Sequence, residues 1–188
     1  MQSLPPNVPA SLKMVCMWVK ETLTNGKTII CTFDEKNFGK VLKTFVNKKD
    51  INNFATMKEV SGSCISIYIS YLHGVLKKSK MVEMVGFVCP TDIGAIGCGN
   101  PIERSRAIAN RMRNAKRGQI FFLPYNCGAH WMLTVINPHE DIVYFMDPLK
   151  RRLATGEWKD IVNKYSSATK QHRLWLFHNE IHEGHRRG

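Results

Sequence analysis

The chain of 188 residues has no cysteine after Cys127, although it contains six in all. No pair is spaced like a zinc knuckle, because Cys89 and Cys98 are too far apart for one Cys-x-x-Cys arm. The cysteines stand singly, several inside apolar runs such as residues 29–31, unlike the dense pattern of a disulfide-stabilised secreted domain. We therefore expect reduced thiols in an intracellular protein of the nucleus or cytosol.

The chain also lacks an apolar run of the roughly 18 residues that a membrane span requires. Residues 1–10 contain three prolines and no basic-then-apolar signal segment, so they are interpreted as a linker. No phosphate-loop or dinucleotide pattern is present, and no cofactor is expected. Acidic residues are scarce, with 15 Asp and Glu against 27 Lys and Arg, a formal net charge of +12. This balance favours acidic partners, either nucleic acid or an acidic protein surface.

Hydrophobic periodicity predicts both helices and strands. Helices are expected at 12–19, 41–46, 103–116 and 157–165, and also at 64–76, where the pattern fits a strand or a helix but the length favours a helix. Strands are expected at 28–33, 82–88, 119–123 (ended by Pro124), 131–136 and 142–146. The last two are almost continuously apolar, which indicates a central sheet buried on both faces by helices. Beyond residue 164 the sequence becomes polar, so we expect one domain at 11–165 and a divergent, disordered tail at 166–188.

The last two strands are joined by the short segment 137–140, which predicts an antiparallel hairpin. If Pro138 and His139 form the centre of the turn, His130 lies opposite Asp147 at the open end of the hairpin. Opposed residues have Cβ atoms about 5 Å apart, so the carboxylate can reach the imidazole. A carboxylate in that position orients the ring, and the ring can take a proton from a thiol or hydroxyl nucleophile. The alternative is a surface ion pair with no catalytic role.

Three motifs resemble a known family: Leu-Pro-Tyr-Asn at 123–126, His130-Trp131-x-Leu133, and Asp147-Pro148-Leu149 after an apolar strand. They are similar to the ubiquitin-like-protein-specific cysteine proteases, which include SUMO-processing enzymes and many plant relatives, several of them linked to transposable elements. The resemblance covers about residues 28–165. It implies an α+β, papain-like cysteine proteinase fold, with a central mixed or antiparallel sheet and flanking helices.

The resemblance also implies roles for individual residues. His130 would be the general base and Asp147 its orienting acid. Trp131 would line a narrow channel that admits a Gly-Gly tail. The partner would be a ubiquitin-like modifier of the SUMO type or its conjugates, and the reaction would be hydrolysis after the Gly-Gly tail or of an isopeptide bond.

The chain departs from the family after Asp147, where the family has Gln-x5-Cys-Gly. Here Gln171 is followed six positions later by Phe177, not by a cysteine. We therefore expect a domain without its last catalytic segment, truncated and inactive as a peptidase. The alternative is a non-catalytic basic module that binds a ubiquitin-like protein or nucleic acid. Cys127 lies three residues before His130 and could approach the site, but its order in the chain is wrong for the family and no oxyanion hole is evident.

Two further features are weighed as sites. His178 and His182 have the spacing of two zinc ligands on a helix, but Asn179 stands where the zincin motif requires glutamate, so no metal site is expected. The predicted helix at 103–116 carries a row of basic side chains: Arg104, Arg106, Arg111, Arg113 and Lys116. We interpret this row as a solvated helix face, with contact to an acidic partner as the functional alternative.

Overall fold

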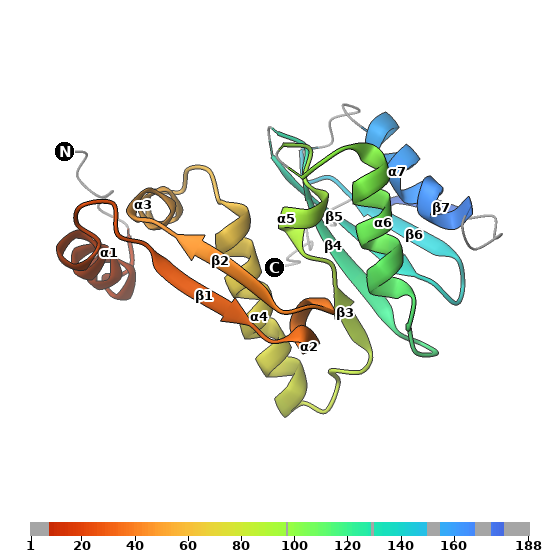
Figure 1. Cartoon of the computed structure of the whole chain (residues 1–188), viewed down its shortest axis with the longest axis horizontal. Coiled ribbons are helices and arrows are strands. Elements are labelled where there is room, and N and C mark those ends of the chain that lie inside the picture. The colour runs from red at the N-terminus through yellow and green to blue at the C-terminus, as the bar shows by residue number, and fades with distance from the viewer. Residues whose placement is uncertain (1–7, 97, 129, 150–154, 168–173, 179–188) are drawn as a thin grey trace, which may run out of the picture.

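The N-terminal part of the chain forms a hairpin with helices around it (Figure 1). The computed structural model describes residues 8–96, 98–128, 130–149, 155–167 and 174–178, with side chains omitted at 155–156, 165–167 and 174–178. The first elements are α1 (Ala10–Thr22), β1 (Ile29–Phe33), α2 (Glu35–Phe38), β2 (Leu42–Val46), α3 (Lys48–Ala55) and α4 (Gly62–Lys78). The predicted helices at 12–19 and 64–76 and the strand at 28–33 are confirmed.

The predicted helix at 41–46 is wrong, because these residues form β2, which pairs antiparallel with β1. Thr44 and Val46 point inward, whereas Val41 and Phe45, which suggested a helical stripe, are exposed. Inward and outward positions therefore alternate with the period of a strand. The polar residues that follow begin α3, where Asn47 and Asp50 form a reciprocal capping box.

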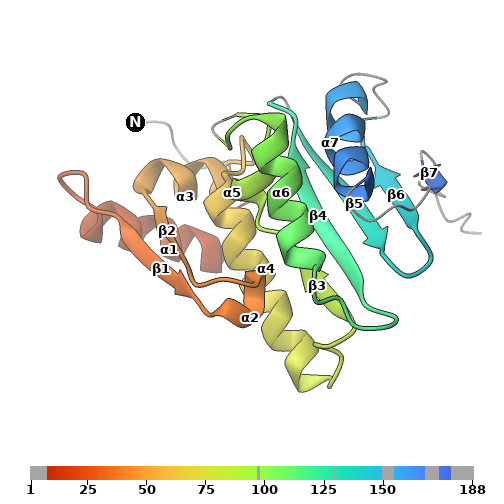
Figure 2. The same ribbon diagram turned by 45° about the vertical axis from the view of Figure 1, so that its right-hand side comes forward.

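Helix α4 lies between this hairpin and the main sheet (Figure 2). Its buried Ile69 belongs to a cluster with Phe33 and Phe38 on one side and Phe87 on the other. The helix begins at a Ser61 cap, whose side chain accepts a hydrogen bond from Cys64 N. This packing joins the N-terminal hairpin to the sheet.

The main sheet has five strands in the order β3-β4-β5-β6-β7. They are β3 (Val85–Phe87), β4 (Ile120–Asn126), β5 (Trp131–Asn137), β6 (Ile142–Met146) and β7 (Leu174–His178). The central pairs β4–β5 and β5–β6 are antiparallel, while β3 and β7 run parallel to their neighbours, so the sheet is mixed. Strand β7 falls within the segment predicted to be a disordered tail, so residues 174–178 correct that prediction. Residues 1–7, 168–173 and 179–188 lie outside the description.

Strand β4 continues through Pro124, although proline was predicted to end it. The carbonyls of Phe122 and Asn126 both accept hydrogen bonds from the β3 side of β4, from Val88 N and Ala95 N. Pro124 lies between them, so its ring nitrogen points to the same side. Strand β3 has already ended there, and no sheet hydrogen bond is lost.

Helices α6 (Pro101–Met112) and α7 (Thr155–Ser167) cover one face of the sheet side by side, and the short α5 (Pro90–Ile93) precedes α6 (Figures 1 and 2). Alternate residues of β4, β5 and β6 meet the two helices in a core that includes Phe121, Leu123, Ile136, Phe145 and Trp158. Burial on both faces is not general, because Tyr144 in β6 is exposed. No helix in the described part of the chain is long and apolar enough to cross a membrane.

The basic row predicted for 103–116, of which Arg104, Arg106 and Arg111 lie on α6, is only partly solvated. Arg104 is 3% exposed, and its Nη2 lies 2.7 Å from Glu157 Oε1 of α7. Arg111 is half-buried; its Nε donates to Phe87 O at 2.8 Å, and its guanidinium lies over the Phe121 ring. Burial lowers the pKa of Arg111. Two of the five cations therefore tie α6 to α7 and to the sheet, which corrects the prediction of a wholly solvated face.

Candidate active site

His130 and Asp147 flank the open end of the β5–β6 hairpin, as predicted. His130 immediately precedes β5, and Asp147 immediately follows β6. The ring Nε2 of His130 lies 2.8 Å from Asp147 Oδ1. Asp147 is 5% exposed, and its Oδ1 also accepts a hydrogen bond from Leu149 N at 2.9 Å. A carboxylate held in this way fixes the orientation of the imidazole.

The register that led to this pair was wrong by two residues. Leu133 pairs with Met146 and Asn137 with Ile142, so the connecting loop is 138–141 and not a turn centred on Pro138 and His139. The Asn137 side chain accepts hydrogen bonds from the backbone of His139 and Glu140, and Asp141 takes a left-handed φ of 54°. A shift of two residues keeps every side chain on its face. His130 and Asp147 are therefore diagonal neighbours that still touch.

Trp131 faces away from the core shared with α6 and α7. Its Nε1 donates to Val60 O at 2.8 Å, and its ring lies beside Gly62 at the start of α4. The indole is half-buried. It therefore stands at the junction between the sheet and the N-terminal layer, next to His130 in the chain.

The thiol of Cys127 contacts Nδ1, the second ring nitrogen of His130. Its Sγ is 3.4 Å from His130 Nδ1, and Cys127 N donates to His130 O across the intervening turn. Sequence reasoning noted that Cys127 was near but gave it no role, because the family order places the nucleophile after the aspartate. The spacing Cys-x-x-His before a strand was the available signal, since residues three apart across a tight turn come into contact.

Tyr125 of β4, two residues before Cys127, is buried in the core under α6 and α7. Tyr125 stacks on Trp158 with ring centroids 4.1 Å apart. Burial raises the pKa of Tyr125, and the nearby Glu157 carboxylate adds to the rise while Arg104 opposes it. This aromatic pair joins β4, the strand that leads to Cys127, to α7.

No group of three or more metal-ligating side chains occurs among the described residues. The side chains of the histidines weighed as zinc ligands, His178 and His182, lie outside the description. No cofactor site is assigned.

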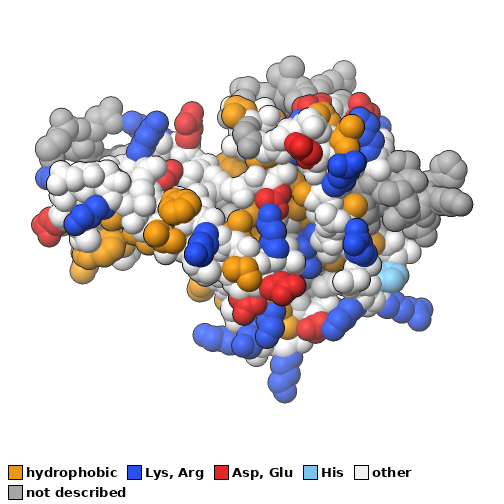
Figure 3. Space-filling model, viewed as in Figure 1, with side chains coloured by type: hydrophobic (Ala, Val, Ile, Leu, Met, Phe, Trp, Pro, Cys, Tyr) orange, Lys and Arg blue, Asp and Glu red, His pale blue; other side chains and the backbone are white. Residues whose placement is uncertain are grey.

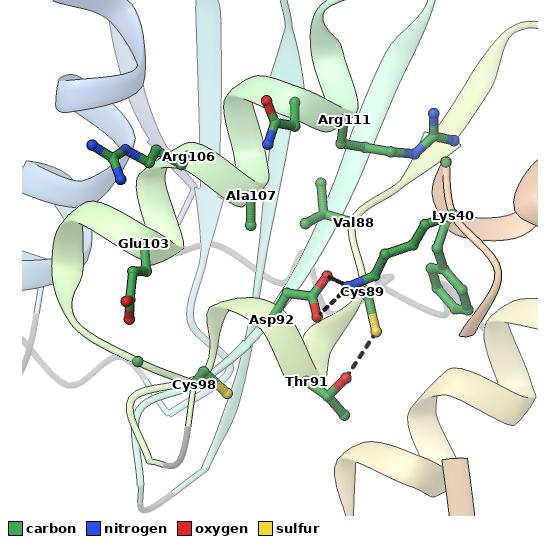
Figure 4. Close-up of a pocket in the computed structure, with 14 residues that line it drawn as sticks. Lys40, Val88, Cys89, Thr91, Asp92, Cys98, Glu103, Arg106, Ala107 and Arg111 are labelled. Atoms are coloured by element: carbon green, nitrogen blue, oxygen red, sulfur yellow. Dashed lines mark hydrogen bonds and ion pairs between the residues drawn. The ribbon is translucent and has the colours of Figure 1, made fainter. Parts of the chain in front are cut away.

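A separate cavity of about 730 Å³ lies between α6 and the connection from α2 to β2 (Figure 4). Its charged groups are largely paired: Lys40 Nζ lies 2.8 Å from Asp92 Oδ2, and Arg111 is bonded to Phe87 O. Cys89 lines it, and burial raises the pKa of this thiol. Neither His130 nor Asp147 lines this cavity.

The fold is similar to that of known protease structures. The first match is the crystal structure of a de-sumoylating protease, with a TM-score of 0.53 and 14% identity over 80% of this chain and 62% of that one. The second is the C-terminal Ulp1 protease domain in complex with Smt3, the yeast ortholog of SUMO, with a TM-score of 0.50 and 14% identity over 94% of this chain and 77% of that one. The chain has the fold of the SUMO proteases. It spans less than two thirds of the first structure's length, no protein-family model matches it, and no curated protein matches its sequence.

Proposed function

We propose that this chain is a cysteine-peptidase-type domain of the ubiquitin-like-protein protease family, centred on residues 11–165. The observation that carries the proposal is the contact of 2.8 Å between His130 Nε2 and the buried Asp147 Oδ1 at the mouth of the sheet. A surface ion pair would leave both groups open to water, but their side chains are only 12% and 3% exposed.

The hydrogen bonds define the chemistry that the pair can perform. An ionised carboxylate can only accept, so Nε2 of His130 is the donor and Nδ1 is the basic nitrogen of the neutral ring. Nδ1 can take a proton from a nucleophile and return it to a leaving amine. The carboxylate also stabilises the imidazolium that exists between these steps.

The partner that we propose is a ubiquitin-like modifier of the SUMO type, bound through its Gly-Gly tail. Two features support it: the fold of the SUMO proteases, and Trp131 beside His130, where the family resemblance implies the tail channel. The modifier's tail would then reach the His130 ring along the junction between the sheet and α4.

Titration of SUMO against the protein by calorimetry tests the partner. We expect Trp131→Ala to weaken binding by about tenfold, because a buried aromatic contact contributes 1–2 kcal/mol or more to an interface. Trp18→Ala, on the exposed face of α1, is the matched control and leaves the affinity unchanged. No binding of SUMO to the folded wild-type chain would refute this assignment.

A second candidate is a non-catalytic basic module that binds an acidic protein or nucleic acid. The net charge of +12 favours it. On the face shown in Figure 3, Lys and Arg side chains are spread over the molecule with Asp and Glu among them, and they do not form one continuous stripe. Such a distribution gives long-range attraction that salt screens, with little geometric selectivity.

Salt dependence separates the two candidates. If the basic surface dominates, the affinity for a single-stranded oligonucleotide should exceed that for SUMO and fall steeply between 50 and 200 mM salt, roughly as the number of phosphate contacts dictates. If the peptidase-type site dominates, SUMO binds more tightly, and its affinity depends on the Gly-Gly tail. Comparison of SUMO with a form lacking the two glycines measures this directly.

A further inference from the structure

Cys127, His130 and Asp147 form a continuous chain of contacts. Asp147 Oδ1 lies 2.8 Å from one ring nitrogen of His130, and Cys127 Sγ lies 3.4 Å from the other. These are the three chemical groups of a cysteine-protease triad, in the order thiol, imidazole, carboxylate. The order along the sequence differs from that of the family, but a triad is defined by geometry and not by sequence position.

We propose that Cys127 is the nucleophile that His130 serves in this chain. The inference rests on the proposed function for its substrate, a glycyl carbonyl at the end of a ubiquitin-like modifier. Cys127 is half-buried: it packs against the core shared with α6 and α7, and the next residue, Gly128, is exposed, so a carbonyl would approach from the side of Gly128. The thiolate is the reactive form of cysteine, and Nδ1 of His130 is placed to accept the thiol proton.

The reaction follows in two balanced steps. Cys127 Sγ attacks the glycyl carbonyl carbon while its proton passes to His130 Nδ1; the C–N bond then breaks, and the amine leaves with that proton as a thioester forms. Water next attacks the thioester carbonyl and gives its proton to Nδ1. The C–S bond breaks, the modifier leaves with a free carboxyl group that keeps the second water proton, and the proton on Nδ1 returns to Sγ.

The geometry also predicts slow turnover of amides. An oxyanion formed at the attacked carbonyl needs hydrogen-bond donors near the thiol. The two nearest backbone N–H groups in sequence already have acceptors: Cys127 N donates to His130 O, and Gly128 N donates to Asn126 Oδ1. Loss of one oxyanion donor typically lowers kcat by about 10²–10³. The site should therefore capture electrophiles readily and hydrolyse unactivated amide bonds slowly.

The experiment uses SUMO whose C-terminal carboxyl is replaced by a thiol-reactive electrophile, followed by intact mass and peptide mapping. We expect one adduct, on Cys127. Cys127→Ala abolishes it, and His130→Ala slows it by about tenfold or more because the proton acceptor is gone. The matched control is Cys98→Ser: that thiol is also half-buried, but burial raises its pKa, and its removal leaves the rate unchanged.

Chloroacetamide, a small electrophile that needs no modifier site, separates the two proposals. If SUMO binds but neither reagent labels Cys127 faster than Cys98, the inference is overturned and the proposed function stands. If chloroacetamide labels Cys127 in a His130-dependent way but SUMO does not bind, the activated thiol is supported and the proposed function with its substrate falls. Labelling of Cys127 at an unchanged rate in His130→Ala, or an adduct mapped to another cysteine, overturns the nucleophile assignment.

Discussion

Trp158 packs helix α7 against β5, the strand that His130 immediately precedes. It is fully buried, its Nε1 donates to Thr134 Oγ1 of β5 at 2.7 Å, and its ring stacks on Tyr125. Trp158→Phe keeps an aromatic ring but leaves the buried Thr134 hydroxyl without its donor. The unsatisfied hydroxyl costs about 1–3 kcal/mol, and the smaller ring adds a cavity, so we expect a total loss of about 2–4 kcal/mol.

Urea denaturation monitored by circular dichroism measures this loss. With a slope of about 2 kcal/mol/M, the midpoint falls by about 1–2 M while the slope stays the same. The control is Trp18→Phe on α1, where the side chain is 52% exposed and the change should stay within about 0.5 kcal/mol. Combining Trp158→Phe with Thr134→Val removes both partners and should recover part of the loss. A midpoint shift for Trp158→Phe as small as that for Trp18→Phe would refute the packing of α7 on β5.

Three other predictions concern the scaffold. The Asn100 side chain accepts hydrogen bonds from Ile102 N and Glu103 N at the start of α6, so Asn100→Ala should lower the free energy of unfolding by about 1 kcal/mol. The control is Asn114→Ala at an exposed position, which should leave the free energy of unfolding unchanged. Arg111→Ala should cost about 1–3 kcal/mol in the same urea assay because Phe87 O loses its donor, whereas the exposed Arg113→Ala should cost less than about 0.5 kcal/mol. Burial raises the pKa of Cys89 above the ordinary 9.0, so above about pH 9 the unfolded chain loses this proton before the folded chain does, and stability falls. Cys89→Val should show a smaller fall between pH 8 and pH 10, and equal falls in both proteins would contradict the role of this thiol.

The sheet and the His–Asp pair were predictable because their signals are strong and local. Two apolar strands joined by a short polar segment favour a tight hairpin, and a pair at its open end stays on one face and within reach after a register shift of two residues. The loop length was not predictable from the residue types alone. It depends on the Asn137 side chain, which accepts hydrogen bonds from the loop backbone, and on the left-handed conformation of Asp141.

The errors share a physical cause: tertiary contacts override a local pattern. Val41 and Phe45 suggested a helix, yet both are exposed, and pairing with β1 makes the segment a strand. Pro124 suggested a strand end, but the shortness of β3 leaves its missing N–H without consequence. Arg104 suggested a solvated surface, but α7 covers it. Each outcome depends on a partner segment that the local sequence does not identify.

The orientation of His130 limits what any nucleophile can do at this site. Asp147 occupies Nε2, so only Nδ1 remains to accept a proton, and among the described residues Cys127 Sγ lies on it. One ring nitrogen has one lone pair, so a second thiol brought to this site could use Nδ1 only after Cys127 is displaced. If this site has a nucleophile, Cys127 either is that nucleophile or competes with it for Nδ1. If Cys127 is the nucleophile, Cys127→Ala lowers the rate at which the protein reacts with a thiol-directed electrophile. If Cys127 is a competitor, the same change raises the rate at the second thiol. The direction of the change in rate therefore distinguishes the two roles.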